Sequence, residues 1–257
     1  MPRFTLVSFV LACVVSATAQ NLQRDPSAIG FLTQAVSAAG GSSSISAVQD
    51  FTAQGTITHY WDDSPEQGQL TVKSLGPSQF RIDSAVTEGT WSSITNNSLG
   101  EISLPDGTTV SLPPHNLLNN GNLTLPIVKV NAALLDQTQS IVDMGLVQFG
   151  SGQARQIGIQ RNLQNDPTGA LSKLTRMDYF FDPSSLLLLR VRYVVHPNTD
   201  MIAGANRVVL DFGSYQNVNG IVAPFSIKQA IAGQQIWAMQ LSSIAFNTGL
   251  SDSDFQF

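Results

Sequence analysis

The pattern of hydrophobic and polar residues changes from a helical period to a strand period near Asp50. Before that point, apolar residues recur on one face of a helix, namely Ile29, Leu32, Val36 and Ala39. We expect this helix to be capped by Asp25, to hold Pro26 in its first turn and to end at Gly40-Gly41. Its apolar face predicts packing against another part of the protein.

From Asp50 onward, alternating apolar and polar residues predict β-strands. One face of the first strand carries Phe51, Ala53, Ile57, His59 and Trp61. The next strands are predicted around Leu70 and Val72, around Phe80 and Ile82, and over Thr87–Thr95, which contains Trp91. Pro105-Asp106-Gly107 then predicts a hairpin that joins Glu101–Leu104 to Thr108–Leu112.

The middle of the chain interrupts the strands with a Pro- and Asn-rich loop, followed by a second predicted helix within Leu123–Asp136. The strand pattern then returns over Ser140–Phe149, Gln153–Arg161, Leu174–Phe181, Leu186–Val195, Arg207–Tyr215, Val222–Ala232 and Gln235–Phe246. In the last segment the apolar parity changes between Leu241 and Ile244, which predicts a bulge near Ser242-Ser243. About ten strands in hairpin succession and two helices predict a mainly β (α+β) protein, a large curved antiparallel sheet covered by helices on one side.

Composition adds a domain count and excludes some partners. The 257 residues show no internal linker or repeat, so residues 20–257 are predicted to form a single domain. Hydrophobic residues make up 42% of the chain, enough for a substantial core. The 13 basic residues against 18 acidic residues form no cluster, which argues against a nucleic-acid partner.

The N-terminus has the pattern of a signal peptide. Arg3 precedes an apolar stretch, and Ala17-Thr18-Ala19 provides the small residues that signal peptidase reads, so residues 1–19 are predicted to be removed before Gln20. The only cysteine, Cys13, would leave with that segment. An alternative is that Val10-Leu11-Ala12-Cys13 serves as a lipoprotein cleavage box, which would make Cys13 the lipidated first residue.

The sequence contains no recognisable catalytic or metal-binding constellation. The three histidines have no ligand spacing, and no G-x-S-x-G elbow or phosphate-binding loop occurs, so we expect a protein without catalytic residues, cofactor or metal. His59 is predicted to lie in the core, whereas His115 and His196 adjoin prolines and are predicted at the surface.

The C-terminus leaves two interpretations open. Phe255-Gln256-Phe257 ends on an aromatic residue, as the strands of many outer-membrane barrels do. Asp252 and Asp254 directly before it favour instead a tail packed onto the sheet, and we expect a protein that is not integral to a membrane.

The second half of the chain resembles the LolA-like lipoprotein-carrier superfamily of Gram-negative bacteria, especially its secreted branches. The resemblance is carried by Asp178–Pro183 with Leu186–Arg190, by Tyr215–Phe225, and by Phe246-Asn247 with Asp252–Phe255. It covers Ser140–Phe257, and the first half only in the order of elements. It implies an incomplete β barrel, a strongly curved antiparallel sheet with helices covering its concave face, that holds acyl chains. The arginine that gates the cavity of the best-studied carrier has no matching position in this sequence.

These observations lead to the hypothesis of a non-enzymatic protein, in the periplasm or at the cell surface, that binds a lipid or a lipoprotein acyl chain between sheet and helices. Candidate lining residues are Ile29, Leu32, Val36, Phe51, Ile57, Trp61, Phe80, Ile82 and Trp91. Two alternatives remain. One is an envelope module with a filled core and a protein partner; the other is an unrecognised hydrolase.

Overall fold

The computed structural model describes residues 22–60, 64–119, 123–196 and 205–257. The predicted signal peptide and Trp61 therefore lie outside the described residues. Within the described part of the chain, no helix is long and apolar enough to cross a membrane.

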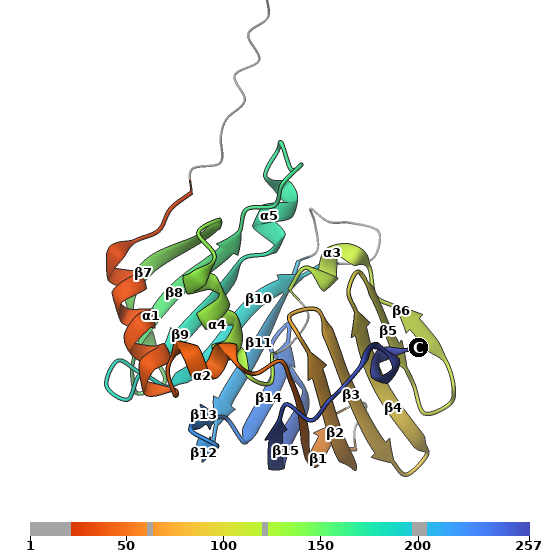
Figure 1. The fold of residues 1–257 in the computed structure, drawn as a ribbon. Helices are drawn as coiled ribbons and strands as arrows, with labels where there is room; N and C mark the ends of the chain where they lie inside the picture. Colours follow the sequence, from red (N-terminus) through yellow and green to blue (C-terminus); the bar gives the residue numbers. More distant parts are fainter. Residues whose placement is uncertain (1–21, 61–63, 120–122, 197–204) are drawn as a thin grey trace, which may run out of the picture.

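Helices occupy two main stretches, one at the N-terminal end and one in the middle of the chain (Figure 1). The helices are α1 Pro26–Ala38, α2 Ser42–Ser46, α3 Pro114–Leu117, α4 Pro126–Leu135 and α5 Ala170–Leu174, with the short 3-10 turn η1 Asp252–Phe255 at the C-terminus.

Strands make up most of the remaining described residues. Those of the first half are β1 Asp50–His59, β2 Glu66–Leu75, β3 Gln79–Val86, β4 Gly89–Asn96, β5 Leu99–Ser103 and β6 Thr109–Ser111. Those of the second half are β7 Gln139–Phe149, β8 Gly152–Arg161, β9 Met177–Phe181, β10 Leu188–Val195, β11 Asn206–Gly213, β12 Gln216–Val218, β13 Ile221–Ala223, β14 Ser226–Ile231 and β15 Gln234–Phe246.

Thirteen of these described strands form one antiparallel sheet in the order β6-β5-β4-β3-β2-β1-β15-β14-β11-β10-β9-β8-β7. The two ends of the order are different strands, β6 and β7, so the described sheet does not close into a barrel. The expected curved antiparallel sheet is confirmed, with more and shorter strands than the pattern indicated. The prediction of one continuous strand over Val222–Ala232 is wrong, because the chain turns at Pro224-Phe225 between β13 and β14.

The sheet order explains why helices lie over the concave face. Each half of the chain builds its strands largely by successive hairpins, and the halves meet where β1 pairs with β15. The chain therefore passes from one edge of the sheet, β6, to the opposite edge, β7, through α3 and α4. Figure 1 shows α1, α2 and α4 in front of the inner face of the curved sheet.

Alternating burial along the strands confirms the predicted inward face. In β1, Phe51, Ala53, Ile57 and His59 are buried, whereas Gln54 is exposed. The same face of the sheet receives α1, whose Phe31 ring meets the Phe181 ring of β9 edge-on at 5.6 Å. Burial of these apolar side chains supplies most of the driving force for folding.

The predicted bulge in the last strand is present. Gln54 of β1 pairs with Ser243, and the next residue, Gly55, pairs with Leu241, so Ser242 is the extra residue. This extra residue lets Trp237, Met239 and Leu241 on one side of it and Ile244 on the other all be buried.

The C-terminal segment packs on the outer face of the sheet. Asp254 of η1 pairs with Lys73 of β2 at 2.7 Å, and Phe255 is fully buried. Lys73 has the opposite parity to the core residue Val72, which places η1 on the convex side. The prediction that the C-terminal tail packs onto the sheet is therefore confirmed.

The start of α1 differs from the prediction. Asp25 is the N-cap residue, but its side chain makes no capping hydrogen bond to the helix. Its carboxylate instead accepts a hydrogen bond from the backbone N–H of Asp143 at 2.9 Å, at the edge strand β7. The neighbouring Arg24 donates to the carbonyl oxygens of Leu134 and Asp136 at the end of α4, at 3.0 and 2.8 Å. A cation is favourable at this negative end of a helix, and it fixes α4 to the N-terminal segment.

Candidate functional site

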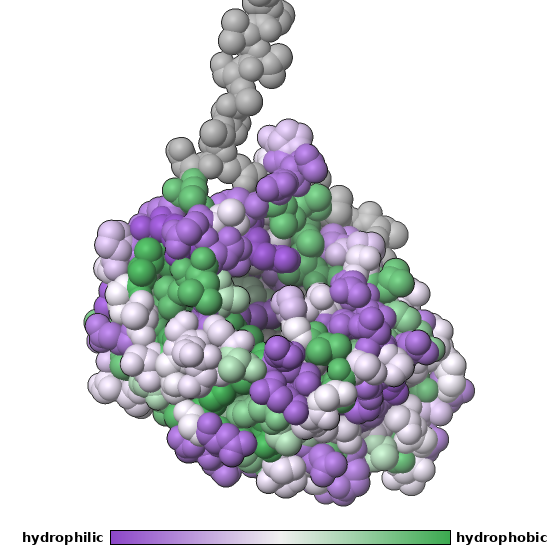
Figure 2. All heavy atoms as spheres, in the orientation of Figure 1, coloured by the Kyte–Doolittle hydropathy of each residue, from purple (hydrophilic) through white to green (hydrophobic). Residues whose placement is uncertain are grey.

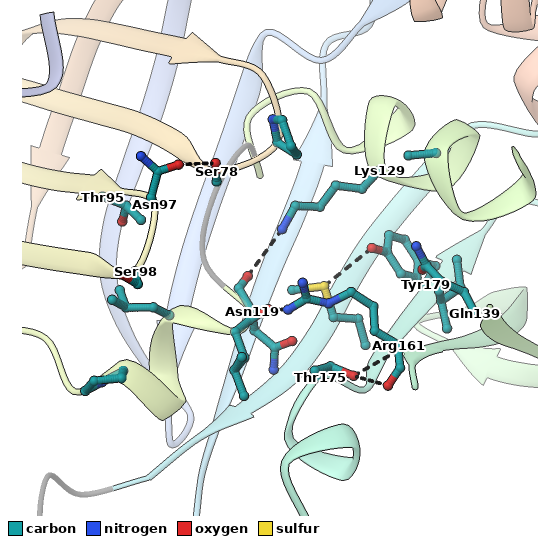
Figure 3. A pocket seen from close by; sticks show the side chains of 17 residues that line it. Ser78, Thr95, Asn97, Ser98, Asn119, Lys129, Gln139, Arg161, Thr175 and Tyr179 are labelled. Carbon is teal, nitrogen blue, oxygen red and sulfur yellow. Dashed lines mark hydrogen bonds between the residues drawn. The ribbon is translucent and has the colours of Figure 1, made fainter. Parts of the chain in front are cut away.

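Two neighbouring cavities lie between the sheet and the crossing segment that contains α3 and α4. The larger, here called the Lys129 cavity, has a volume of about 520 Å³. It is lined by Pro77, Ser78, Thr95, Asn97, Ser98, Pro114, Leu117, Leu118, Asn119, Lys129, Ala132, Gln139, Ile159, Arg161, Thr175, Met177 and Tyr179. Figure 2 shows this face of the molecule hollowed near its centre, and Figure 3 shows the lining from close by.

The smaller cavity, here called the Trp91 cavity, has a volume of about 300 Å³ and a mainly apolar lining that also includes Ser93, Asn116, Thr124 and Gln229. Its walls come from β3, β4, β5, β10, β11, β14 and β15, together with α3 and the segment before α4. The two cavities adjoin at β3 and β4. Phe80, which lines the Trp91 cavity, pairs across the strands with Thr95, which lines the Lys129 cavity.

Two cationic side chains, Lys129 and Arg161, line the larger cavity. Lys129 comes from α4 and is partly exposed, because it borders the hollow. Burial within protein, and secondarily the positive charge of Arg161, lowers the pKa of Lys129 to about 7. Arg161 ends β8 and is exposed, which places it at the mouth of the cavity. Burial of part of the guanidinium also lowers the pKa of Arg161.

Both cations reach the same short backbone segment. The Lys129 ammonium donates to the carbonyl oxygen of Asn119 at 3.4 Å, and the Arg161 guanidinium donates to that of Leu118. The Asn119 side chain in turn donates to the carbonyl oxygen of Leu174. Figure 3 shows Lys129 and Arg161 extending toward Asn119 from different elements.

Hydrogen bonds fix the two elements that carry these residues, the end of β8 for Arg161 and α4 for Lys129. The Thr175 hydroxyl accepts from the backbone N–H of Arg161 at 2.9 Å and donates to the Arg161 carbonyl oxygen at 3.1 Å. On α4, the side-chain amide of Asn131 donates to the Ser46 hydroxyl of α2 at 2.8 Å. Since α4 and β8 are both anchored, the two cations are held against the same cavity wall.

The predicted lining residues are divided among three places. Phe80, Ile82 and Trp91 come together around the Trp91 cavity. Leu32, Val36, Phe51 and Ile57 lie in the core and are not among the residues that line either cavity. Ile29 is half-buried on α1, and Trp61 lies outside the described residues.

His59 lies in the core, as predicted, and is close to Trp91. Its Nε2 is 3.0 Å from the Ser84 hydroxyl, and its ring centroid is 5.1 Å from that of Trp91. Burial lowers the pKa of His59 to about 4, against a smaller opposing effect of Glu66, so the imidazole is neutral at pH 7.

The prediction that both His115 and His196 lie at the surface is wrong. His196 is buried, His115 is half-buried, and their ring centroids are 6.4 Å apart. The approach of α3, which contains His115, to the end of β10, which His196 follows, therefore brings together two histidines that are far apart in sequence. Among the described residues, no group of three or more His, Cys, Asp or Glu side chains is arranged to hold a metal ion.

Sequence reasoning missed both cations of the larger cavity. The signal for Lys129 is its position as the one charged residue in the ten-residue helix PIVKVNAALL. A lone lysine in an apolar helix is expensive to bury, so it marks either a solvent-exposed edge or a cavity. Arg161 has no comparable signal, because an arginine at a strand end is ordinary.

Replacing Lys129 with methionine should stabilise the protein at pH 7 and remove a pH dependence. In an unfolded chain the lysine pKa is about 10.4, so between pH 7 and that value the unfolded state binds the additional proton. The free energy of unfolding of the unsubstituted protein should therefore rise with pH by about 1 kcal/mol per unit over this window. Arg161 and Tyr179 face the same cavity, and neither titrates between pH 7 and 9, because burial raises the pKa of Tyr179.

Urea unfolding of the unsubstituted protein and of Lys129→Met at pH 7, 8 and 9 measures how the free energy of unfolding depends on pH. Lys228→Met on β14, where the lysine is exposed, is the control and should keep the pH dependence of the unsubstituted protein. An equal pH dependence in Lys129→Met would show that Lys129 is not the titrating group.

Comparisons with known proteins identify the fold of this chain. No protein-family model and no curated protein sequence matches the chain. Among solved structures, a domain from Vibrio parahaemolyticus named for outer membrane lipoprotein sorting superposes with a TM-score of 0.53 at 11% identity, covering 90% of this chain and 96% of that one. A LolA superfamily protein from Nitrosomonas europaea gives a TM-score of 0.52 at 10% identity, with 90% and 98% covered.

A third structure, a DUF1329 family protein from Desulfovibrio piger, gives a TM-score of 0.50 at 12% identity and covers 89% of this chain and 97% of that one. Each likeness extends over nearly the whole length of both proteins. At such low identity the comparison concerns the arrangement of the backbone. The sequence resemblance to LolA-like carriers is thus confirmed at the level of structure: the chain has the fold of the LolA superfamily.

Proposed function

We propose that this protein is exported to the cell envelope and binds an apolar ligand, a lipid or the acyl chain of a lipoprotein, between the sheet and the helices. The observation that carries the proposal is the pair of adjoining cavities, of about 520 and 300 Å³, between the inner face of the sheet and the crossing segment. Ligand sites in proteins commonly have volumes of about 300–1,000 Å³.

Apolar walls suit an acyl chain because hydrophobic affinity requires no directional partner. Each buried methylene group contributes about 0.8 kcal/mol. We propose that Phe80, Ile82 and Trp91 contact the ligand in the Trp91 cavity, whereas Leu32, Val36, Phe51 and Ile57 support the walls from the core. The likeness to a domain named for lipoprotein sorting supports a role in lipid binding at the level of the fold.

The N-terminal pattern supports the location. Residues 1–19 have the charged start, apolar stretch and small-residue site of a signal peptide, and residues 20–257 would form the mature single domain in the periplasm or at the cell surface of a Gram-negative bacterium. We propose a binding role without catalysis, because the described residues that line the cavities are two cations with apolar and neutral polar side chains, among which no hydrogen-bonded pair of nucleophile and base is found.

Expression of the whole chain with its N-terminal segment, followed by native mass spectrometry, tests this function. We expect a mature mass that begins at Gln20, with additional mass from a bound lipid, and displacement of that lipid by a fluorescent fatty-acid probe. Protein that is consistently ligand-free and does not bind the probe would contradict the proposal. Capture of one protein partner without lipid would favour an interaction module, and a lipidated N-terminus at Cys13 would identify a lipoprotein.

A further inference from the structure

The charged side chains among the described residues that line the Lys129 cavity are all cationic. Two of its residues, Lys129 and Arg161, are cationic, and none of the described residues that line it is acidic. The pKa of Lys129 is lowered both by burial and by the positive charge of Arg161, so the two groups disfavour each other's charged state. An anion placed beside both would relieve this repulsion and would stabilise the protonated form of Lys129.

The geometry places both cations beside the segment that follows α3. Lys129 contacts the carbonyl oxygen of Asn119, and Arg161 contacts that of the preceding residue, Leu118. An oxyanion entering at Arg161 would therefore meet the guanidinium first and the ammonium deeper in the cavity. A guanidinium has five N–H donors and binds carboxylate or phosphate oxygens in a bidentate fashion.

The remainder of the cavity is suited to a hydrocarbon chain. Ile159 and Met177 on the sheet side and Ala132 on α4 present apolar surface next to the two cations. Phe80, the cross-strand partner of Thr95, lines the neighbouring Trp91 cavity, which offers further apolar surface. A small inorganic anion would satisfy the charges and leave this apolar surface uncovered.

From the charge and the shape together we propose that the Lys129 cavity binds an anionic amphiphile with a single acyl chain, its carboxylate or phosphate head between Lys129 and Arg161. This inference rests on the proposed function, because it names the chemical class of the apolar ligand. Lys129 and Arg161 are then the residues that distinguish an anionic lipid from a neutral one.

Titration calorimetry on the mature protein with four probes tests the head group and the chain separately. The probes are dodecanoate, dodecyl phosphate, the neutral dodecanol and inorganic phosphate. We expect both anionic amphiphiles to bind at least about tenfold more tightly than dodecanol, an added stabilisation of about 1.4 kcal/mol, with no measurable binding of inorganic phosphate. The ratio of the affinities for dodecanoate and dodecyl phosphate shows whether the site prefers a fatty acid or a phospholipid-type ligand.

Three variants locate the head group. Lys129→Met and Arg161→Gln should each reduce the preference for dodecanoate over dodecanol to less than about threefold and leave dodecanol binding intact. The matched control Lys228→Met removes one exposed positive charge from β14 and should keep the full preference. Thermal unfolding of each variant verifies that it is folded.

The possible outcomes separate this inference from the proposed function. Equal binding of dodecanol and dodecanoate, or a preference that survives in both Lys129→Met and Arg161→Gln, would overturn the head-group assignment and leave apolar binding in place. Absence of binding by all three dodecyl probes would overturn both. Inorganic phosphate that binds as tightly as dodecyl phosphate would overturn the assignment of an acyl chain.

Discussion

Replacing Gly55 with alanine should destabilise the protein by about 3 kcal/mol or more. A Cβ atom at this position would lie 2.2 Å from the carbonyl oxygen of Gln240 and 2.7 Å from the Cα of Leu241. Both atoms belong to the backbone of β15, which cannot rotate away as a flexible side chain would. Gly55 also lies at the register shift opposite the bulge, where β1 and β15 join the two halves of the sheet. The substitution should therefore weaken the pairing that holds the halves together.

Urea unfolding followed by circular dichroism measures this loss, and Gly30→Ala provides a matched control. Gly30 lies inside α1, where an added Cβ would have no atom within 4 Å. Alanine there should stabilise the protein by about 0.5–1 kcal/mol, because glycine is a poor helix former. Unfolding midpoints that change equally in the two variants would mean that the close backbone approach at Gly55 is not what determines its identity.

Replacing Ala132 with tryptophan should lower the affinity for dodecanoate by roughly 50-fold, if about three methylene groups lose their place in the cavity. Ala132 is an exposed residue of α4 that lines the Lys129 cavity, so a large ring at this position would project into the hollow. The free energy of unfolding should change little, because the ring occupies existing space and does not displace core side chains.

Gln34→Trp is the control for this experiment. Gln34 is an exposed residue of α1 that lines neither of the two cavities, so the variant adds the same ring elsewhere on the helical layer. Its affinity for dodecanoate should equal that of the unsubstituted protein. Dodecanoate that binds Ala132→Trp at unchanged affinity would show that the acyl chain does not occupy the Lys129 cavity.

Local structure could be predicted well from particular residues. Pro26 and Gly40-Gly41 mark the two limits of α1, and Pro105-Asp106-Gly107 lies in the turn between β5 and β6. The change of parity after Leu241 predicted the bulge at Ser242. Each of these signals acts over a few neighbouring residues, because turn geometry, capping and side-chain alternation are local properties of the backbone.

The candidate site was predicted only in part. Apolar positions on strands identify side chains that face the interior, which is why Phe80, Ile82 and Trp91 were named before their cavity was known. The same pattern cannot distinguish a residue that lines a cavity from one that packs in the core, and Leu32 and Ile57 are core residues. Lys129 and Arg161 come from separate elements of the chain, so their approach depends on how α4 crosses the sheet.

The sequence by itself determined the mainly β class, the helix at each predicted place, the inward face of the strands and the absence of a recognisable catalytic motif. Only the tertiary structure decided that β1 pairs with β15, that α3 and α4 cross between opposite edges of the sheet, and that this crossing leaves two cavities with two cations in one of them. The physical reason is the separation along the chain of the residues that interact. Periodicity and turn residues encode interactions between near neighbours, whereas the volume and charge of a cavity arise where elements from distant parts of the chain meet.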